Sequence, residues 1–76
     1  MNHERRAVLR DVQEQLIDAS GKLSNAYLDE ISSYQALPEG LKATANGTSM
    51  ENAIECMSDA IVSIFDATKK INEIVE

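Results

Sequence analysis

The chain has 76 residues and a formal net charge of -6, which makes duplex nucleic acid and anionic membrane surfaces poor partners for it. A single cysteine, Cys56, excludes an internal disulfide, and a single histidine, His3, argues against a Cys/His zinc site. A core this small is marginal by itself, so we expect the missing stability to come from self-association.

The composition also bounds the fold and the compartment. Two tyrosines, one phenylalanine, one proline and three glycines favour helices over a β-sandwich. No apolar run approaches the roughly 20 residues of a membrane span, and residues 1–10 lack the apolar centre of a signal peptide. We therefore expect one all-α domain, residues 1–76, that is soluble, cytoplasmic and without membrane contact.

The first long helix is predicted at about residues 4–35. Its apolar residues follow one another at steps of three and four: Leu9, Val12, Leu16, Ala19 and Leu23. The large apolar side chains then come at Tyr27, Ile31 and Tyr34, which widens the repeat toward eleven residues and should relax the supercoil. Gly21 costs about 1 kcal/mol relative to alanine, so a break there competes with one continuous helix, which the pattern favours.

A turn is predicted at residues 36–48. Leu37 precedes Pro38 and is therefore pushed out of the helical region. A short helical turn at 38–43, with the proline first, would fold Leu37 and Leu41 back over the end of the helix pair. Residues 44–47, which end in Gly47, have the composition of a turn.

The second long helix is predicted at about residues 49–75, with Thr48 and Glu51 as its capping box. Its apolar residues alternate steps of four and three over the whole length: Met50, Ile54, Met57, Ile61, Ile64, Thr68, Ile71 and Val75. A heptad repeat of this length packs lengthwise against a neighbouring helix. The sequence thus predicts an antiparallel two-helix hairpin.

Further apolar and small residues lie beside these rows. Ile17 and Leu28 flank Gly21 on the first helix, and a row of alanines follows the second helix at steps of seven. We expect a homodimer that forms a four-helix bundle, with higher oligomers left open, through Ile17, Gly21, Leu28, Ala53, Ala60 and Ala67. The alternative is that these are helix-favouring residues on a solvated surface.

No residue pattern indicates catalysis. His3 has no hydroxyl or thiol in register, no Glu-x-x-His motif is present, and Cys56 is expected to be a half-buried, small apolar residue. We expect no catalytic residue, no metal site, no cofactor and no enzymatic activity. The many carboxylates are interpreted as a solvated surface or, alternatively, as a mimic of nucleic acid that binds a basic groove on another protein.

One end of the hairpin should be richer in cations, because antiparallel helices bring the start of the first beside the end of the second. A candidate site for a small anion, such as a signalling nucleotide, comprises Arg5, Arg6, Arg10, Lys69 and Lys70. The alternative is that the lysines interact with the helix dipole and the arginines pair with nearby acids.

Short motifs resemble those of a group of small helical proteins common in phages and prophages. They are the opening Met-Asn-x-Glu-Arg-Arg at 1–6, the Leu-Pro-Glu turn at 37–39, Asn46-Gly47, and Met-Glu-x-Ala-Ile at 50–54. This turn and second helix are less acidic than in that group, and richer in Ser, Ala and Ile. The resemblance implies an accessory protein that acts in a bacterial host cell by binding a host protein. Inhibitors of bacterial defence systems belong to this class. A sponge or sensor for a small anionic ligand and a purely structural assembly module are the alternatives.

Overall fold

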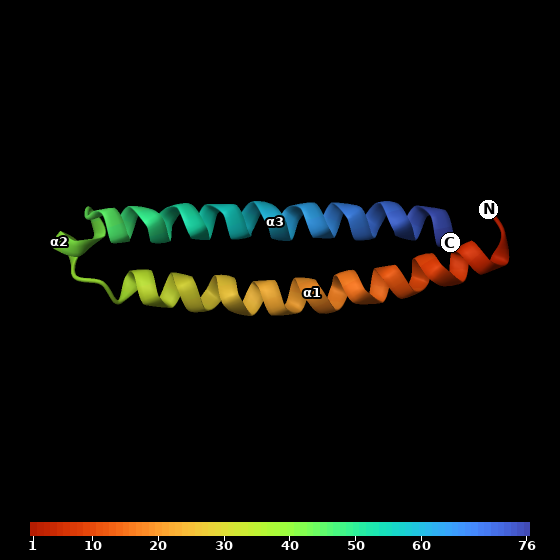
Figure 1. Ribbon diagram of the computed structural model, residues 1–76, viewed down its shortest axis with the longest axis horizontal. Coiled ribbons are helices and arrows are strands. Elements are labelled where there is room, and N and C mark those ends of the chain that lie inside the picture. The colour runs from red at the N-terminus through yellow and green to blue at the C-terminus, as the bar shows by residue number, and fades with distance from the viewer.

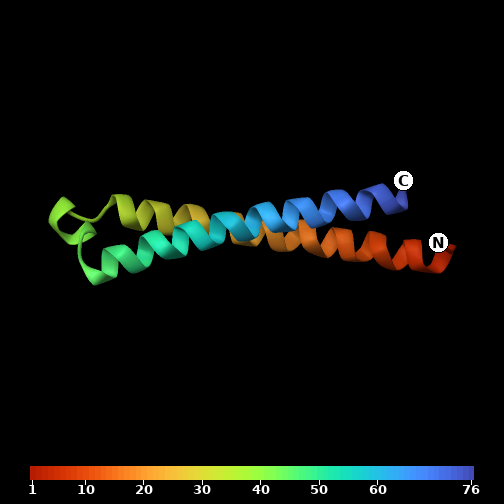
Figure 2. The same cartoon turned by 90° about the horizontal axis from the view of Figure 1, so that it is seen from above.

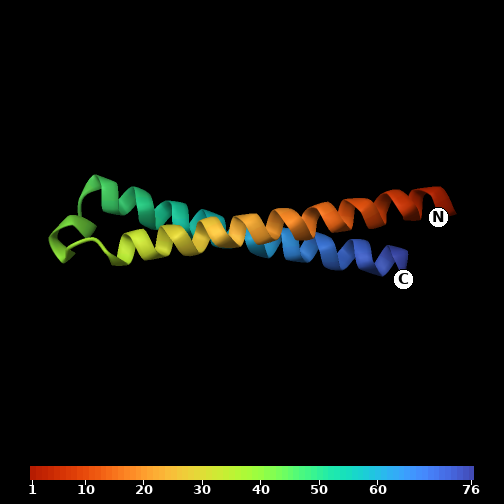
Figure 3. The same ribbon diagram turned by 90° about the horizontal axis from the view of Figure 1, so that it is seen from below.

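The computed structural model describes all 76 residues and is a helical hairpin. Helix α1 spans His3–Gln35, α2 spans Glu39–Lys42, and α3 spans Ala45–Val75 (Figure 1). The long helices lie antiparallel side by side, and Figures 2 and 3 show them crossing at a small angle. The Cα atoms extend over 58 × 14 × 14 Å. The all-α hairpin expected from the sequence is confirmed, and neither long helix has the apolar stretch that crossing a membrane requires.

Helix α1 is continuous through Gly21. It begins where the Asn2 side chain accepts a hydrogen bond of 2.8 Å from the backbone N–H of Arg5, which caps the first turn. A Cβ added at Gly21 would meet no atom within 4 Å, so nothing in the hairpin requires glycine there. The continuous helix favoured by the sequence is confirmed, and it ends before Pro38 as expected.

The contact between the long helices follows a heptad seam on both of them. All eight residues predicted for α3, from Met50 to Val75, are half-buried or buried. Nine of the twelve partly covered residues of α1 also alternate steps of three and four: Arg6, Leu9, Gln13, Leu16, Ser20, Leu23, Tyr27, Glu30 and Tyr34. The other three, Val12, Ser24 and Ile31, lie beside this row. The predicted row is wrong at Ala19, which is exposed while Ser20 is partly covered. The residues predicted to continue the row after Leu23, namely Tyr27, Ile31 and Tyr34, are all partly covered.

The turn differs from its prediction at the start of α3. The helix begins at Ala45, and its cap is Thr44, whose side chain accepts a hydrogen bond of 3.4 Å from Gly47 N–H, rather than Thr48. Gly47 is buried inside the first helical turn, where an added Cβ would lie 2.2 Å from the carbonyl oxygen of Lys42. Glycine is therefore required by the close approach of α2, and not by a turn conformation.

Helix α2 begins one residue later than expected, after Pro38. Leu37 is half-buried at this end of the hairpin, but Leu41 remains 50% exposed. The expectation that both leucines cover the end of the helix pair is thus wrong for Leu41, half of which stays in contact with solvent.

Candidate functional site

Most apolar side chains of the hairpin remain in contact with solvent. Only 2 of the 76 residues are buried, and neither carries a large side chain. The accessible surface is 5487 Å², whereas a compact monomer of the same mass exposes about 4,600 Å². The excess of roughly 900 Å² is close to the area of about 800 Å² that one partner contributes to a standard protein interface.

Hydrogen bonds between the long helices fix their register. The Gln13 side chain donates to the carbonyl of Thr68 and to the side chain of Asn72, both at 3.4 Å. Arg10 donates to the carbonyl of Val75 at 3.3 Å. With α1 and α3 antiparallel, this register places Gly21 at nearly the same height along the rod as Val62.

On one side of the seam lies a surface that we call the apolar face. Its large members are well exposed: Ile17 is 59% exposed, Leu28 58%, Val62 64% and Phe65 72%. Its small members lie between them: Gly21, Ser24 and Ser58. Ile17 and Phe65 line the same open hollow of about 350 Å³, which shows that α1 and α3 both contribute to this face.

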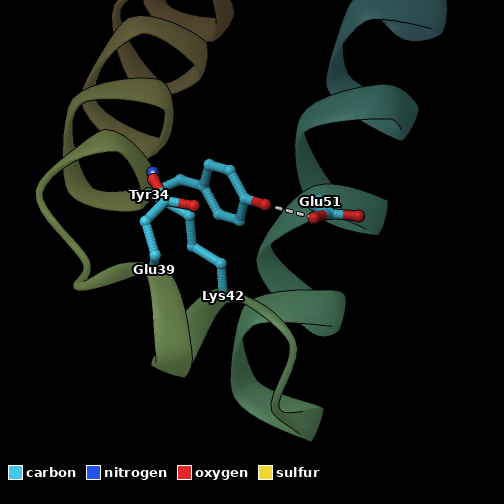
Figure 4. A network of polar contacts seen from close by, with 4 residues as sticks. All are labelled: Tyr34, Glu39, Lys42 and Glu51. Atoms are coloured by element: carbon cyan, nitrogen blue, oxygen red, sulfur yellow. Dashed lines mark hydrogen bonds and ion pairs between the residues drawn. The ribbon is translucent and has the colours of Figure 1, made fainter.

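The apolar face ends in an acidic hollow beside the turn. This hollow has a volume of about 490 Å³ and includes Ile31, Ser58, Glu51 and Glu55 in its lining. The hydroxyl of Tyr34 donates a hydrogen bond to the Glu51 carboxylate across the two helices (Figure 4). That bond is the main reason why the pKa of Tyr34 is raised above its ordinary value.

Lys42 of helix α2 packs against the outer side of this end. Its ammonium group lies 5.5 Å from the centre of the Tyr34 ring and 2.9 Å from the Glu39 carboxylate. Figure 4 shows these side chains beside the Tyr34 to Glu51 bond. Lys42 thus joins α2 to the end of α1, while the carboxylate of Glu55 has no cationic partner.

The opposite side of the seam is lined by alanines, and we call it the alanine face. Ala53, Ala60 and Ala67 are half-buried there beside the seam, and Ala19 and Ala26 are exposed. The residues predicted to mediate self-association are therefore divided, because Ile17, Gly21 and Leu28 belong to the apolar face. One pair of hairpins facing each other cannot use both sets.

Val62 and Phe65 were not assigned to an interface from the sequence. The residue seven positions before Val62 is Glu55, and the residue seven positions before Phe65 is Ser58. Because both of these are polar, the heptad repeat of α3 alone places Val62 and Phe65 beside the seam and not in an interface. Only the register with α1 reveals that they share a face with Ile17 and Leu28.

The five cations of the candidate anion site are not gathered into one cluster. Arg10 binds the end of α3 through the Val75 carbonyl. Arg5 and Arg6 precede it in the first turns of α1, and the start of this helix extends beyond the end of α3 (Figure 1). The register places Lys70 about 12 Å along the rod from Arg6. None of the five forms an ion pair, and Nε of Arg6 is covered without a hydrogen-bond partner.

Cys56 is exposed, so the expectation of a half-buried thiol is wrong. No three or more His, Cys, Asp or Glu side chains come together in a geometry that could hold a metal ion. Comparisons of this chain with protein-family models, with curated proteins and with solved structures found no match. The candidate functional site is the apolar face with its acidic hollow.

Proposed function

We propose that this chain is a non-enzymatic interaction protein that forms a homodimeric four-helix bundle and acts by binding another protein. The apolar face is the observation that carries this proposal. Its four large side chains lie on one side of the seam of a hairpin with almost no buried residues. Surfaces of this kind are covered in most stable proteins, because each exposed side chain forfeits roughly 1.5–3 kcal/mol of burial.

The partner protein would bind to the outer surface of the four-helix bundle. Two copies carry twice the charge of -6 of one chain, and the carboxylates of α3 that lie opposite the seam, Asp59, Asp66 and Glu73, are exposed. Such a surface favours a basic partner through long-range attraction. The resemblance to small phage proteins supports a host protein, including a component of a defence complex, as the target.

Sedimentation equilibrium at micromolar concentration tests the assembly. We expect twice the 8.4 kDa mass of one chain, and a folded monomer at these concentrations would contradict the proposal. Capture from host lysate tests the partner, with an Asp59→Asn, Asp66→Asn, Glu73→Gln variant as control. A partner lost with these carboxylates supports binding through the outer surface, and a dimer that captures nothing indicates a structural assembly module.

A second function is favoured by the unpaired cations at the open end of the hairpin. Two copies that meet at their open ends, rather than side by side, would bring together more such groups than one chain contains. That cluster would bind a small anionic ligand such as a nucleotide. A bound nucleotide would raise the melting temperature by mass action, and an Arg6→Glu, Lys70→Glu variant would lose the shift. An unchanged melting temperature across a nucleotide panel would remove this alternative.

A further inference from the structure

We infer that the second copy docks on the apolar face in an antiparallel orientation, so that the turn of each hairpin lies beside the termini of the other. The two-fold axis passes between Gly21 and Ser24 of α1 and close to Val62 of α3. This inference rests on the proposed homodimer and adds its face, its direction and its register.

The first support is the size of the side chains along the apolar face. With the axis in this place, Phe65 lies beside the partner's Ser58, and Ile17 meets the partner's Leu28 across the small residues at the axis. Ser58 borders the acidic hollow, so each hollow receives apolar side chains from the other copy. Large residues thus meet small ones, as close packing between helices requires.

The parallel orientation has the opposite consequence. It would stack Ile17 of each copy on the partner's Phe65, two large and well-exposed side chains at nearly the same height. It would also place Ser24 over the partner's Ser58, which leaves empty space, and Leu28 over the partner's Glu55, which desolvates a carboxylate. The sequence of sizes along this face therefore selects one direction.

The second support is the distribution of charge along the same face. Its turn end carries Glu51 and Glu55 beside the acidic hollow, and its open end carries Arg10 and Lys69 together with one acid, Glu14. The proposed axis brings Lys69 beside the partner's Glu55 and Arg10 to the height of the partner's Glu51. Each copy contributes both members of both pairs, which is the self-complementarity that a two-fold interface requires.

The contacts within one hairpin leave Glu55, Lys69 and part of Arg10 available, while Glu51 already accepts a hydrogen bond from Tyr34 through one of its two carboxylate oxygens. Neither Glu55 nor Lys69 has an ion-pair partner. Arg10 uses one terminal nitrogen for the Val75 carbonyl, so its other N–H groups are free to donate. The excess exposed area of the single hairpin also matches the area that one partner covers in a stable dimer.

Charge reversal at Glu55 and Lys69 tests the direction of pairing. We expect Glu55→Lys and Lys69→Glu each to raise the dimer dissociation constant about tenfold, and the double variant to restore it to within about threefold. The two residues lie about 21 Å apart on one straight helix, so rescue can only arise between copies. The control is Glu14→Lys with Lys69→Glu, because a parallel dimer pairs Glu14 with the partner's Lys69.

Three outcomes are distinguishable by sedimentation velocity over a concentration series. If Glu55→Lys restores the association of the Lys69→Glu variant and Glu14→Lys does not, the antiparallel register is supported. Rescue by Glu14→Lys, or a dimer that responds to neither charge, overturns it while the proposed homodimer stands. A chain that is monomeric at every concentration removes the homodimer itself.

A disulfide provides an independent measurement of the axis. In a Cys56→Ser background, Val62→Cys should form a cross-linked dimer under mild oxidation, because the antiparallel register brings the two copies of this residue within disulfide reach. The neighbouring Ser63→Cys points to the other side of the helix and should remain a free thiol. Equal cross-linking of the two variants would contradict the proposed axis.

Discussion

The apolar face and the alanine face flank the same seam, yet they differ in what the hairpin covers. Both consist of the helical positions directly beside the heptad residues. On the alanine face, Ala60 and Ala67 of α3 are half-buried beside the seam, while Ala19 and Ala26 of α1 are exposed and present only a methyl group to solvent. On the apolar face, Phe65 reaches past the seam and stays 72% exposed. The two faces thus differ in how much apolar surface they leave for another molecule, because the exposed side chains are large on one and methyl groups on the other.

The substitution with the largest expected effect on dimer formation is Phe65→Glu. The substitution removes one buried aromatic side chain from each copy of the proposed dimer, a loss of about 3–6 kcal/mol for the pair. We expect the dissociation constant to rise at least 100-fold in sedimentation experiments. Circular dichroism on the same samples reports whether the separated hairpins keep their helices.

The matched control is Ala26→Glu, which places the same charge on an exposed position of the alanine face. We expect its dissociation constant to stay within about threefold of the parent protein, because surface substitutions away from contacts change little. Dissociation of this variant with an intact Phe65→Glu dimer would reverse the assignment of the two faces.

Gly47→Ala probes the packing of α2 against the start of α3 and should not distinguish the two faces. The new Cβ would overlap the Lys42 backbone, which has no flexible group to move aside. We expect a loss of about 1–3 kcal/mol in the free energy of unfolding, as for overpacked cores. Urea denaturation measures it, with Gly40→Ala as control because no atom lies within 4 Å of a Cβ there.

Gly47 also shows which part of the fold could not be predicted from the sequence. The α3 seam was predictable in full, since its isoleucines and methionines repeat without a polar interruption except Thr68. The start of α3 was not, because Thr44 and Thr48 are both suitable caps and the choice depends on how closely α2 packs against Gly47. Local patterns cannot reveal a backbone contact made by the folded turn.

The α1 seam was predictable only in part for a different reason. Gln13, Ser20 and Glu30 lie at seam positions, while Ala19 and Ala26, which are more apolar, are exposed. Register on α1 follows from contacts with α3, including the Gln13 hydrogen bonds, rather than from its own hydrophobicity. The apolar face depends on that register, and for this reason Val62 and Phe65 could not be joined to Ile17 beforehand.

Gly21→Ala tests whether the two-fold axis of the proposed dimer lies beside Gly21. Within one hairpin the added methyl group meets nothing within 4 Å, and alanine favours a helix over glycine by about 1 kcal/mol. In the proposed dimer the same methyl group approaches the partner's Ser24. We expect a dissociation constant raised about tenfold together with unchanged or higher helicity, measured by sedimentation and circular dichroism. Stronger association would show that the axis lies elsewhere.

The smallest expected effect lies at the acidic end of the apolar face. Because the Tyr34 hydroxyl donates to the Glu51 carboxylate, the folded protein holds the phenolic proton more tightly than the unfolded chain, whose pKa is near 10.0. This contribution to stability is fully present below that pH and is lost as the pH rises through the raised pKa of Tyr34. Melting temperatures between about pH 9 and pH 11 should therefore fall more steeply for the parent protein than for Tyr34→Phe. Parallel curves would mean that Glu51 is free of Tyr34, and the carboxylate would then be available to the partner's Arg10 without competition.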